Sequence, residues 1–455
     1  MSKNKIILII IAGVFLLFFI WVILNLNTQG ADKNKNEGTN GAYSVWLYQD
    51  NAQDMGKFFS EFKKNNPQYS GTTFSVESFS DYEDYIFTLQ SAFAQGKAPD
   101  LFMLNNSEST PLLEEYTAGI NPDIINPNDF RKKFQDVFSE DLISTVIIGE
   151  GEEAKEVEFL KGIPIGYETL GIYYNKKKQI TASDFYSMSS FNSKVSILSK
   201  RYSRDVPLAL GNGSMVMNVS DVITQFFLLG NNITSIKDIS KSMMGESLLR
   251  YMSYGDIDQE NGYNALFADM IDFQKQPLDM FVKNKVFMVM GYPRMLFDIE
   301  KKGFSPTALA VEPFPFDNNA TGNTLVNYNY FVKNTLSQRK TLSDDLLQYM
   351  SSDMGATSYF KIFPYYFSAL NSLDAELRES KIMNKYKNIT LGDFYNKNHP
   401  IQTVDIGIKT LYDREIVEIG DDTSDYIERF ETLQSTILCK AKKYKTLENL
   451  STSCN

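Results

Sequence analysis

The stretch Leu160-Lys-Gly-Ile-Pro-Ile-Gly-Tyr-Glu-Thr-Leu-Gly-Ile-Tyr-Tyr-Asn175 carries the most information about the fold of this chain. Its first half contains the Gly and Pro residues of a loop, and its second half is an apolar and aromatic run typical of a buried strand. We interpret it as a loop running into a strand that crosses between two lobes. At 455 residues, the chain is long enough for two or three hydrophobic cores.

Strand and helix patterns alternate between residues 43 and 104. Residues 44–48 and 100–104 are short apolar runs, and Phe74 and Val76 suggest a strand between them. Amphipathic helices separate these strands, the first with Met55, Phe58, Phe59 and Phe62 at helical spacing. This order predicts a mainly parallel sheet, with ligand sites beyond the carboxyl ends of its strands.

The N-terminus contains a long apolar segment. Residues 6–24 lack any charged or polar side chain and would span roughly 28 Å as a helix, which predicts an uncleaved membrane span. The alternative is a cleaved signal peptide, but no Ala-x-Ala site follows Leu24. Lys3 and Lys5 place the N-terminus in the cytoplasm, so the rest of the chain is expected outside, behind a flexible linker.

Composition narrows the function. The formal net charge of -11 argues against nucleic-acid binding, which requires a basic surface. His399 is the only histidine, so a histidine metal cluster is impossible and a Ser-His-Asp triad would depend on that one residue. We expect no enzymatic activity, no metal and no cofactor, although a glycoside hydrolase with paired carboxylates stays open as a minor alternative.

The two cysteines lie close together near the C-terminus. Cys439 and Cys454 are the only ones in the chain, and outside the cell they are expected to form a disulfide. The alternative is a pair of free thiols in the tail.

Three segments combine Gly and aromatic residues, two of them with Pro, in a recognisable order. They are Gly96-Lys-Ala-Pro-Asp-Leu-Phe102, Gly162 to Lys176, and Phe281-Val-Lys-Asn-Lys-Val-Phe-Met288 followed by Gly291-Tyr292. Together they resemble the extracytoplasmic solute-binding proteins of ABC importers, in the maltose-binding-like group. Two residues depart from the family pattern. Asn284 replaces a usual Gly, which is tolerable because Asn also accepts a left-handed conformation, and Phe287 replaces Ala.

The resemblance covers roughly residues 43 to 438 and implies a two-lobed α/β fold of the periplasmic-binding-protein type. The chain is expected to cross between lobes near Tyr167, Phe316 and Phe360, and to close on a ligand by hinge motion. The expected divisions are a membrane anchor at 1–26, a linker at 27–42, an N-lobe at 43–168 plus 322–360, a C-lobe at 169–321 plus 361–438, and a tail at 439–455.

The implied function is the capture of a small solute, in the first instance a carbohydrate, in an interlobe cleft. The partners would be the permease subunits of an ABC importer and, through the N-terminal helix, the membrane. The expected location is therefore the cell membrane, with one span and an extracytoplasmic C-terminal domain. An alternative is a sensor or scaffold that has the same fold and is not coupled to transport.

A neutral sugar requires polar groups for its hydroxyls and flat side chains for its ring faces. Loops after the predicted strands supply both, and the candidate ligand contacts are Asp50, Asn51, Asn106, Tyr167, Glu168, Asn212, Tyr292, Arg294, Tyr328, Tyr330 and Tyr365. Further candidates in the same loops are Gln49, Asn105, Ser107, Ser214, Asn327 and Tyr366. The asparagines would alternatively shape turns, and the tyrosines would alternatively belong to the core.

Two further expectations concern the ligand. Trp21 falls in the apolar span and Trp46 in a predicted strand, so tyrosines would have to stack on the solute. A peptide, an amino-acid derivative or a polyol therefore stays open as the ligand beside a sugar.

Replacing Asp50 or Tyr292 by alanine is expected to weaken binding of the ligand and to leave the free energy of unfolding almost unchanged.

Overall fold

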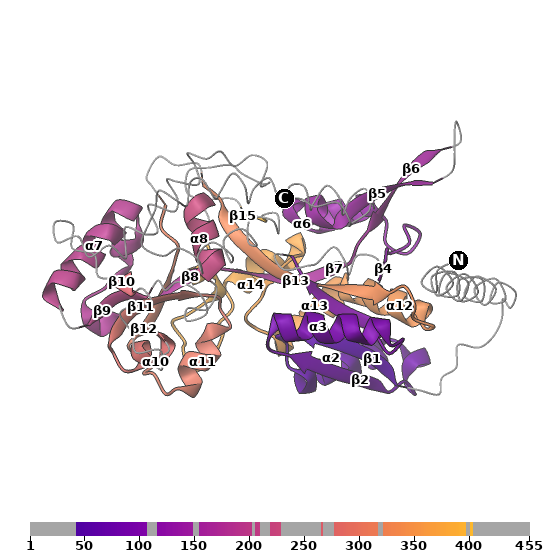
Figure 1. The fold of residues 1–455 in the computed structure, drawn as a ribbon, viewed down its shortest axis with the longest axis horizontal. Helices are drawn as coiled ribbons and strands as arrows, with labels where there is room; N and C mark the ends of the chain where they lie inside the picture. The colour runs from indigo at the N-terminus through magenta and orange to yellow at the C-terminus, as the bar shows by residue number, and fades with distance from the viewer. Residues whose placement is uncertain are drawn as a thin grey trace, which may run out of the picture.

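The structure is a computed structural model. It describes residues 42–106, 116–148, 154–202, 205–209, 219–228, 265–266, 277–316, 322–396 and 401–403. The described strands form two large sheets and one two-stranded hairpin, and most of the helices lie around the two large sheets (Figure 1).

The anchor at 1–26, the linker at 27–42, except for its last residue, and the cysteines at 439 and 454 lie outside the described residues. Within the described part of the chain, no helix has the length and apolar character needed to cross a membrane. The anchor and the disulfide remain predictions.

The first sheet runs in the order β14-β7-β13-β3-β1-β2, with β15 and β4 also paired to β13. Its strands are β1 (Tyr43–Tyr48), β2 (Phe74–Phe79), β3 (Leu101–Asn105), β4 (Thr117–Ala118), β7 (Ile163–Thr169), β13 (Thr324–Asn334), β14 (Phe367–Ser368) and β15 (Ile401–Gln402). Strand β1 pairs in parallel with β2 and β3, as the alternating pattern predicts. The expectation of a mainly parallel sheet is wrong for the sheet as a whole, because β13 pairs antiparallel with β3, β4 and β7, and β7 pairs antiparallel with β14.

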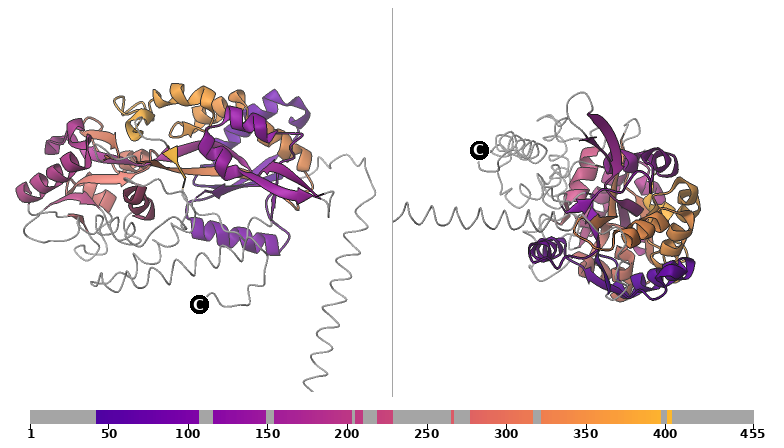
Figure 2. Two further views of the ribbon diagram at one scale, coloured as in Figure 1. Left: turned by 90° about the horizontal axis from the view of Figure 1, so that it is seen from above. Right: turned by 90° about the vertical axis from the view of Figure 1, so that its right-hand side faces the viewer.

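Helices cover both faces of this sheet (Figure 2). They are α2 (Ala52–Asn65), α3 (Tyr82–Ala94), α5 (Pro127–Lys133), α6 (Asp136–Leu142), α12 (Lys340–Met350), α13 (Asp353–Ile362) and α14 (Asn371–Arg378). Successive side chains of β1 point to opposite faces. The Tyr43 hydroxyl therefore lies 2.7 Å from the Ser343 hydroxyl on α12, on one face. The Tyr48 ring packs against Tyr82 of α3 on the other face, with ring centres 4.8 Å apart.

The second sheet runs in the order β10-β9-β11-β8-β12. Its strands are β8 (Gly171–Asn175), β9 (Val206–Ala209), β10 (Ala265–Leu266), β11 (Val286–Gly291) and β12 (Leu309–Pro313). The helices of this part are α7 (Met188–Arg201), α8 (Val219–Leu228), α10 (Pro277–Val282) and α11 (Met295–Lys301). The hairpin is formed by β5 (Ile143–Ile148) and β6 (Lys155–Leu160), which project from the first sheet's side of the molecule (Figure 1).

Both departures from the family pattern have a local explanation. Asn284 lies in the turn before β11 with φ of 61°, the left-handed conformation expected for it. Its side-chain oxygen accepts a hydrogen bond from the amide of Asn175. The Phe287 ring is buried, and the Lys178 ammonium lies 4.0 Å from its centre.

The chain passes directly from the first sheet to the second through residues 163–175. Strand β7 ends at Thr169 and β8 begins at Gly171, so Leu170 alone separates them (Figure 1). A side chain at Gly171 would meet the ring of Phe394 at 2.4 Å, which explains the glycine. The predicted crossing between the sheets is therefore confirmed, but the first half of this stretch is not a loop: Ile163–Thr169 forms a buried strand of the first sheet despite its Pro and Gly residues. A second crossing joins β12 to β13, as the resemblance implied for the region near Phe316.

The third crossing lies later than expected. Phe360 belongs to α13, and the following β14 pairs with β7 in the first sheet, where the Phe367 ring stacks on Tyr167 at 5.0 Å. Helix α14 then packs on β14. The chain reaches the second sheet only by Tyr386, whose hydroxyl donates to the carbonyl of Phe304. The segment 361–378, expected in the C-lobe, thus lies on the first sheet.

A half-buried acid on β12 makes stability depend on pH. Burial and then the nearby Asp393 raise the pKa of Glu312 to about 7. The folded chain therefore holds a proton that the unfolded chain releases near pH 4.5, so this group costs stability as pH rises toward 7. Replacing Glu312 by Gln is expected to raise the free energy of unfolding by about 1–2 kcal/mol at pH 8 and to change little at pH 4.5.

Urea unfolding at the two pH values measures this difference. Glu77→Gln, at an exposed position of β2, is the matched control and is expected to change neither value. An equal effect of Glu312→Gln at both pH values would show that Glu312 does not titrate in this window.

Candidate functional site

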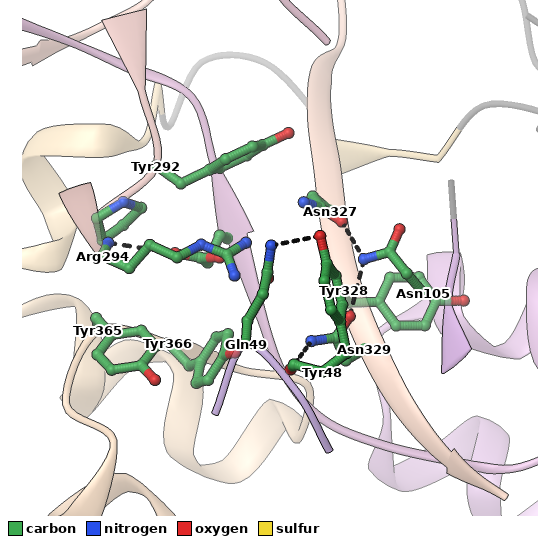
Figure 3. A network of polar contacts seen from close by, with 12 residues as sticks. Tyr48, Gln49, Asn105, Tyr292, Arg294, Asn327, Tyr328, Asn329, Tyr365 and Tyr366 are labelled. Carbon is green, nitrogen blue, oxygen red and sulfur yellow. Dashed lines mark hydrogen bonds and ion pairs between the residues drawn. The ribbon is translucent and has the colours of Figure 1, made fainter. Parts of the chain in front are cut away.

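Polar ends of strands from both sheets meet beside the β7–β8 junction (Figure 3). Gln49 and Asp50 directly follow β1, Tyr292 and Arg294 follow β11, and Glu168 is the second-last residue of β7. We refer to these five residues as the interlobe site. Ligands of open α/β sheets bind beyond the strand ends, so this is the candidate functional site.

An ion pair connects β7 to the segment after β11. Nη2 of Arg294 lies 2.5 Å from Oε2 of Glu168, and the backbone N–H of Arg294 donates to Oε1 at 3.3 Å. The Glu168 side chain is 1% exposed, and this burial raises its pKa to about 7 although Arg294 acts in the opposite direction. Nη1 of Arg294 is also buried but has no hydrogen-bond partner among the described residues.

Asp50 is the acceptor for three tyrosine hydroxyls. Tyr365 and Tyr366 each donate at 3.0 Å, and Tyr359 donates to the second carboxylate oxygen. The Asp50 side chain is fully buried, and burial raises its pKa against the opposing effect of these hydrogen bonds. Asp50 therefore holds the loop after α13 against the loop after β1.

The tyrosines held by Asp50 also contact the second sheet's side of the site. The rings of Tyr365 and Tyr366 lie 4.6 Å apart, and the Tyr365 ring meets Phe297 of α11 edge-on at 5.5 Å. Tyr365 is partly exposed, whereas Tyr366 is buried. The pair presents flat aromatic surface close to Arg294 (Figure 3).

A ladder of amides lines the first sheet beside Gln49. The Asn105 amide donates to the side chains of Asn327 at 2.7 Å and Asn329 at 2.8 Å. The two acceptors share one face of β13 because they are two residues apart. Gln49 donates to the Tyr48 hydroxyl at 2.7 Å, while its own carbonyl Oε1 is buried and has no partner in the part of the chain that the structure describes.

Tyr292 is held rigidly on the second sheet's side. Its hydroxyl donates to Asp221 of α8 at 2.9 Å, and its backbone carbonyl accepts from the Tyr173 hydroxyl at 2.7 Å. The Arg294 guanidinium lies 5.7 Å from the centre of the Tyr292 ring. The ring is 1% exposed, so replacing it by alanine would open a cavity, and the expectation that unfolding stays almost unchanged does not fit this burial.

Comparison with known proteins assigns the sequence to a family. The model of the bacterial extracellular solute-binding proteins matches residues 57–389. The chain belongs to this family. No curated protein sequence matches it significantly.

Two solved structures share the two-lobed fold with this family member. One is the ABC substrate-binding protein Lmo0181 from Listeria monocytogenes in complex with cycloalternan, with a TM-score of 0.61 and 15% identity over 88% of this chain and 99% of that one. The other is the sugar-binding protein MalE from Xanthomonas citri, with a TM-score of 0.63 and 14% identity over 90% of this chain and 100% of that one.

Three residues that were predicted to contact the ligand of this solute-binding protein lie on the face of the first sheet opposite to the interlobe site. Tyr167 alternates with Glu168 along β7, and its hydroxyl meets Asp374 at 3.1 Å. Tyr328 is its partner across the strands and donates to Asp141 of α6 at 2.9 Å. Tyr330 packs beside Tyr328, with ring centres 5.9 Å apart. The structure does not bring these tyrosines to the interlobe site.

The predicted asparagines have local roles. Asn51 caps α2, and its side-chain oxygen accepts from the backbone N–H groups of Gln53 at 2.9 Å and Asp54 at 3.1 Å. Asn106 pairs with the backbone of β13 at Val326 and Tyr328. Asn212, Ser107 and Ser214 lie outside the described residues.

Three residues of the network were not predicted. Asp221 and Tyr359 lie within helices, and only their long-range partners reveal their connection to the site. Asn329 carried a usable signal, because it lies two residues after Asn327 in an apolar strand and must share its face.

A separate surface cavity of about 800 Å³ lies between α2 and α13, lined by Lys57, Glu61, Tyr349, Met354 and Lys361 among others. It lies on a helical face, away from the strand ends, so we do not assign the solute to it. Across the described ranges, no group of three or more His, Cys, Asp or Glu side chains is arranged to hold a metal ion.

Proposed function

We propose that this chain captures a small solute, a carbohydrate, between its two lobes and delivers it to the permease subunits of an ABC importer. The solute is bound and released without chemical change. The interlobe site is its binding site, and the N-terminal apolar segment tethers the extracytoplasmic lobes to the cell membrane.

One observation carries the proposal. The strand-end groups of two separate sheets converge on the place where the chain crosses between them, and they include an ion pair, Glu168–Arg294, with one guanidinium nitrogen unused. A solute bound there would contact both lobes at once. Rotation about the β7–β8 and β12–β13 connections and the later crossing before Tyr386 would close the lobes on it.

The carbohydrate assignment rests on the side-chain types and on the relatives. Carboxylates, amides and a guanidinium lie beside the rings of Tyr365 and Tyr366, which suits a ligand with hydroxyls and apolar ring faces. Of the two similar structures, one is a substrate-binding protein in complex with cycloalternan, and the other is a sugar-binding protein.

We propose lobes that follow the sheets. The N-lobe comprises residues 43–169, 322–378 and the short strand 401–402, and the C-lobe comprises 171–316 and 379–396. Placing α14 in the N-lobe is supported by its packing on β14.

A thermal-shift screen of the protein against neutral and acidic sugars, amino acids and short peptides tests the function. A sugar is expected to raise the melting temperature in a concentration-dependent way, since ligands that bind only the folded state stabilise it. Small-angle scattering with that sugar is expected to show a smaller radius of gyration. Stabilisation by peptides or amino acids, with no response to any sugar, would contradict the assignment.

A further inference from the structure

The charges at the interlobe site are unequal. Three buried carboxyl groups interact at the site: Glu168 forms the ion pair with Arg294, and Asp50 and Asp221 lie close enough to Glu168 to raise its pKa. Their side chains are 1%, 0% and 4% exposed in that order, Glu168 first. Among the described residues, the Asp50 and Asp221 carboxylates accept hydrogen bonds from tyrosine hydroxyls. Burial raises the pKa of Glu168 to about 7 and also raises that of Asp50. At a pH where all three carboxyl groups are ionised, the described part of the site has a formal excess of two negative charges.

Two buried polar atoms of the site are left without partners. Nη1 of Arg294 is a donor and Oε1 of Gln49 is an acceptor, and neither has a hydrogen bond within the described residues. Gln49 is connected to Arg294 through Tyr48: the Gln49 amide nitrogen donates to the Tyr48 hydroxyl at 2.7 Å, and Tyr48 lies close enough to Arg294 to affect its pKa. Figure 3 draws the Gln49 side chain next to the Arg294 guanidinium in its view. Unpaired buried polar atoms are rare in folded proteins, and at a binding site they mark positions that a ligand can fill.

The two atoms need different hydrogen-bond partners: Nη1 of Arg294 needs an acceptor, and Oε1 of Gln49 needs a donor. A hydroxyl accepts one hydrogen bond and donates another, so a single hydroxyl satisfies both. A carboxylate or phosphate oxygen only accepts, so it would satisfy Arg294, leave the Gln49 carbonyl unpaired, and add charge beside three carboxyl groups. An ammonium group only donates, and Arg294 would repel it.

We infer that Arg294 and Gln49 together bind one hydroxyl of an uncharged solute, and that the surrounding carboxyl groups exclude acidic solutes such as uronates and phosphorylated sugars. This inference rests on the proposed function and adds the selection by charge. Gln49 determines the specificity for a hydroxyl, because its carbonyl requires a hydrogen-bond donor that a carboxylate or phosphate oxygen does not supply.

Titration calorimetry with a neutral oligosaccharide from the screen and with its counterpart carrying a C6 carboxylate tests the selection. The neutral sugar is expected to bind at least tenfold more tightly. Asp221→Asn keeps an acceptor for Tyr292 and removes one charge, so it is expected to improve binding of the acidic sugar severalfold more than that of the neutral one.

Replacing Gln49 by Leu is expected to weaken binding of the neutral sugar about tenfold or more, because the acceptor is lost. Gln53→Leu, an exposed glutamine on α2, is the matched control and should bind like the parent. Melting curves of each variant establish that it folds. If Gln49→Leu does not fold, the Asp221→Asn comparison still tests the inference.

The outcomes separate the inference from the proposed function. Equal or tighter binding of the acidic sugar, or parental affinity in a folded Gln49→Leu variant, overturns the selection and leaves sugar capture standing. Absence of binding by sugars of either kind overturns the proposed function and this inference together.

Discussion

Replacing Asp50 by alanine is expected to lower the free energy of unfolding by about 2–4 kcal/mol, because three tyrosine hydroxyls, two of them buried, lose their acceptor. The expectation from the sequence that unfolding stays almost unchanged does not fit this burial. Part of the loss is offset, since the variant no longer buries a carboxyl group. Binding should weaken as well, because Tyr365 and Tyr366 lose the group that orients their rings. Urea unfolding and calorimetry measure the two effects.

Two matched variants separate the hydrogen bonds from the side-chain volume. Asp50→Asn keeps a carbonyl acceptor and is expected to lose at most half as much stability as Asp50→Ala. Asp345→Ala removes a partly exposed acceptor of a single hydroxyl, that of Tyr69 at 2.7 Å, and is expected to cost under about 1 kcal/mol. A loss in Asp50→Ala no larger than in Asp345→Ala would mean that the three tyrosines do not depend on Asp50.

Arg294→Ala is expected to have the second large effect. It leaves Glu168 buried without its cation, and breaking a buried pair in this way costs about 3–5 kcal/mol when the remaining group must stay charged. The pKa of Glu168 is already raised to about 7, and losing Arg294 raises it further. The variant can therefore take up a proton, so the loss should be largest at pH 8 and smaller at pH 6.

The double variant Arg294→Ala with Glu168→Gln provides the control. It carries no buried charge at this pair, so its stability is expected to exceed that of Arg294→Ala at pH 8 and to depend less on pH. Unfolding of parent, single and double variants at both pH values measures the coupling. The same loss for Arg294→Ala at pH 6 and pH 8 would contradict a titrating Glu168.

The architecture was largely predictable where local pattern and tertiary structure agree. The apolar runs at 44–48 and 100–104 became parallel strands, because helices with apolar faces such as that of Met55 to Phe62 cover them. The crossing near Leu170 was expected, but the Gly and Pro residues before it suggested a loop, whereas Ile163–Thr169 is a buried strand of the first sheet. The third crossing was misplaced because β14 has only two residues and leaves no periodic signal.

The site was less predictable, for a physical reason. Strand β7 is buried on both faces, so its sequence lacks the polar alternation that would show that Glu168 faces the site and Tyr167 faces away. The partners of Asp50 lie more than 300 residues later in the chain, and no local pattern encodes such a pair. Loop position after a strand nevertheless identified Asp50, Tyr292 and Arg294 as members of one network.

A crystal structure with the identified solute bound tests the central claim most directly. The solute is expected between the two sheets, with one hydroxyl between Arg294 and Gln49 and a ring face on Tyr365 or Tyr366, and with contacts from both lobes. A solute bound in the surface cavity between α2 and α13, or on one lobe alone with the Glu168–Arg294 pair untouched, would contradict the account.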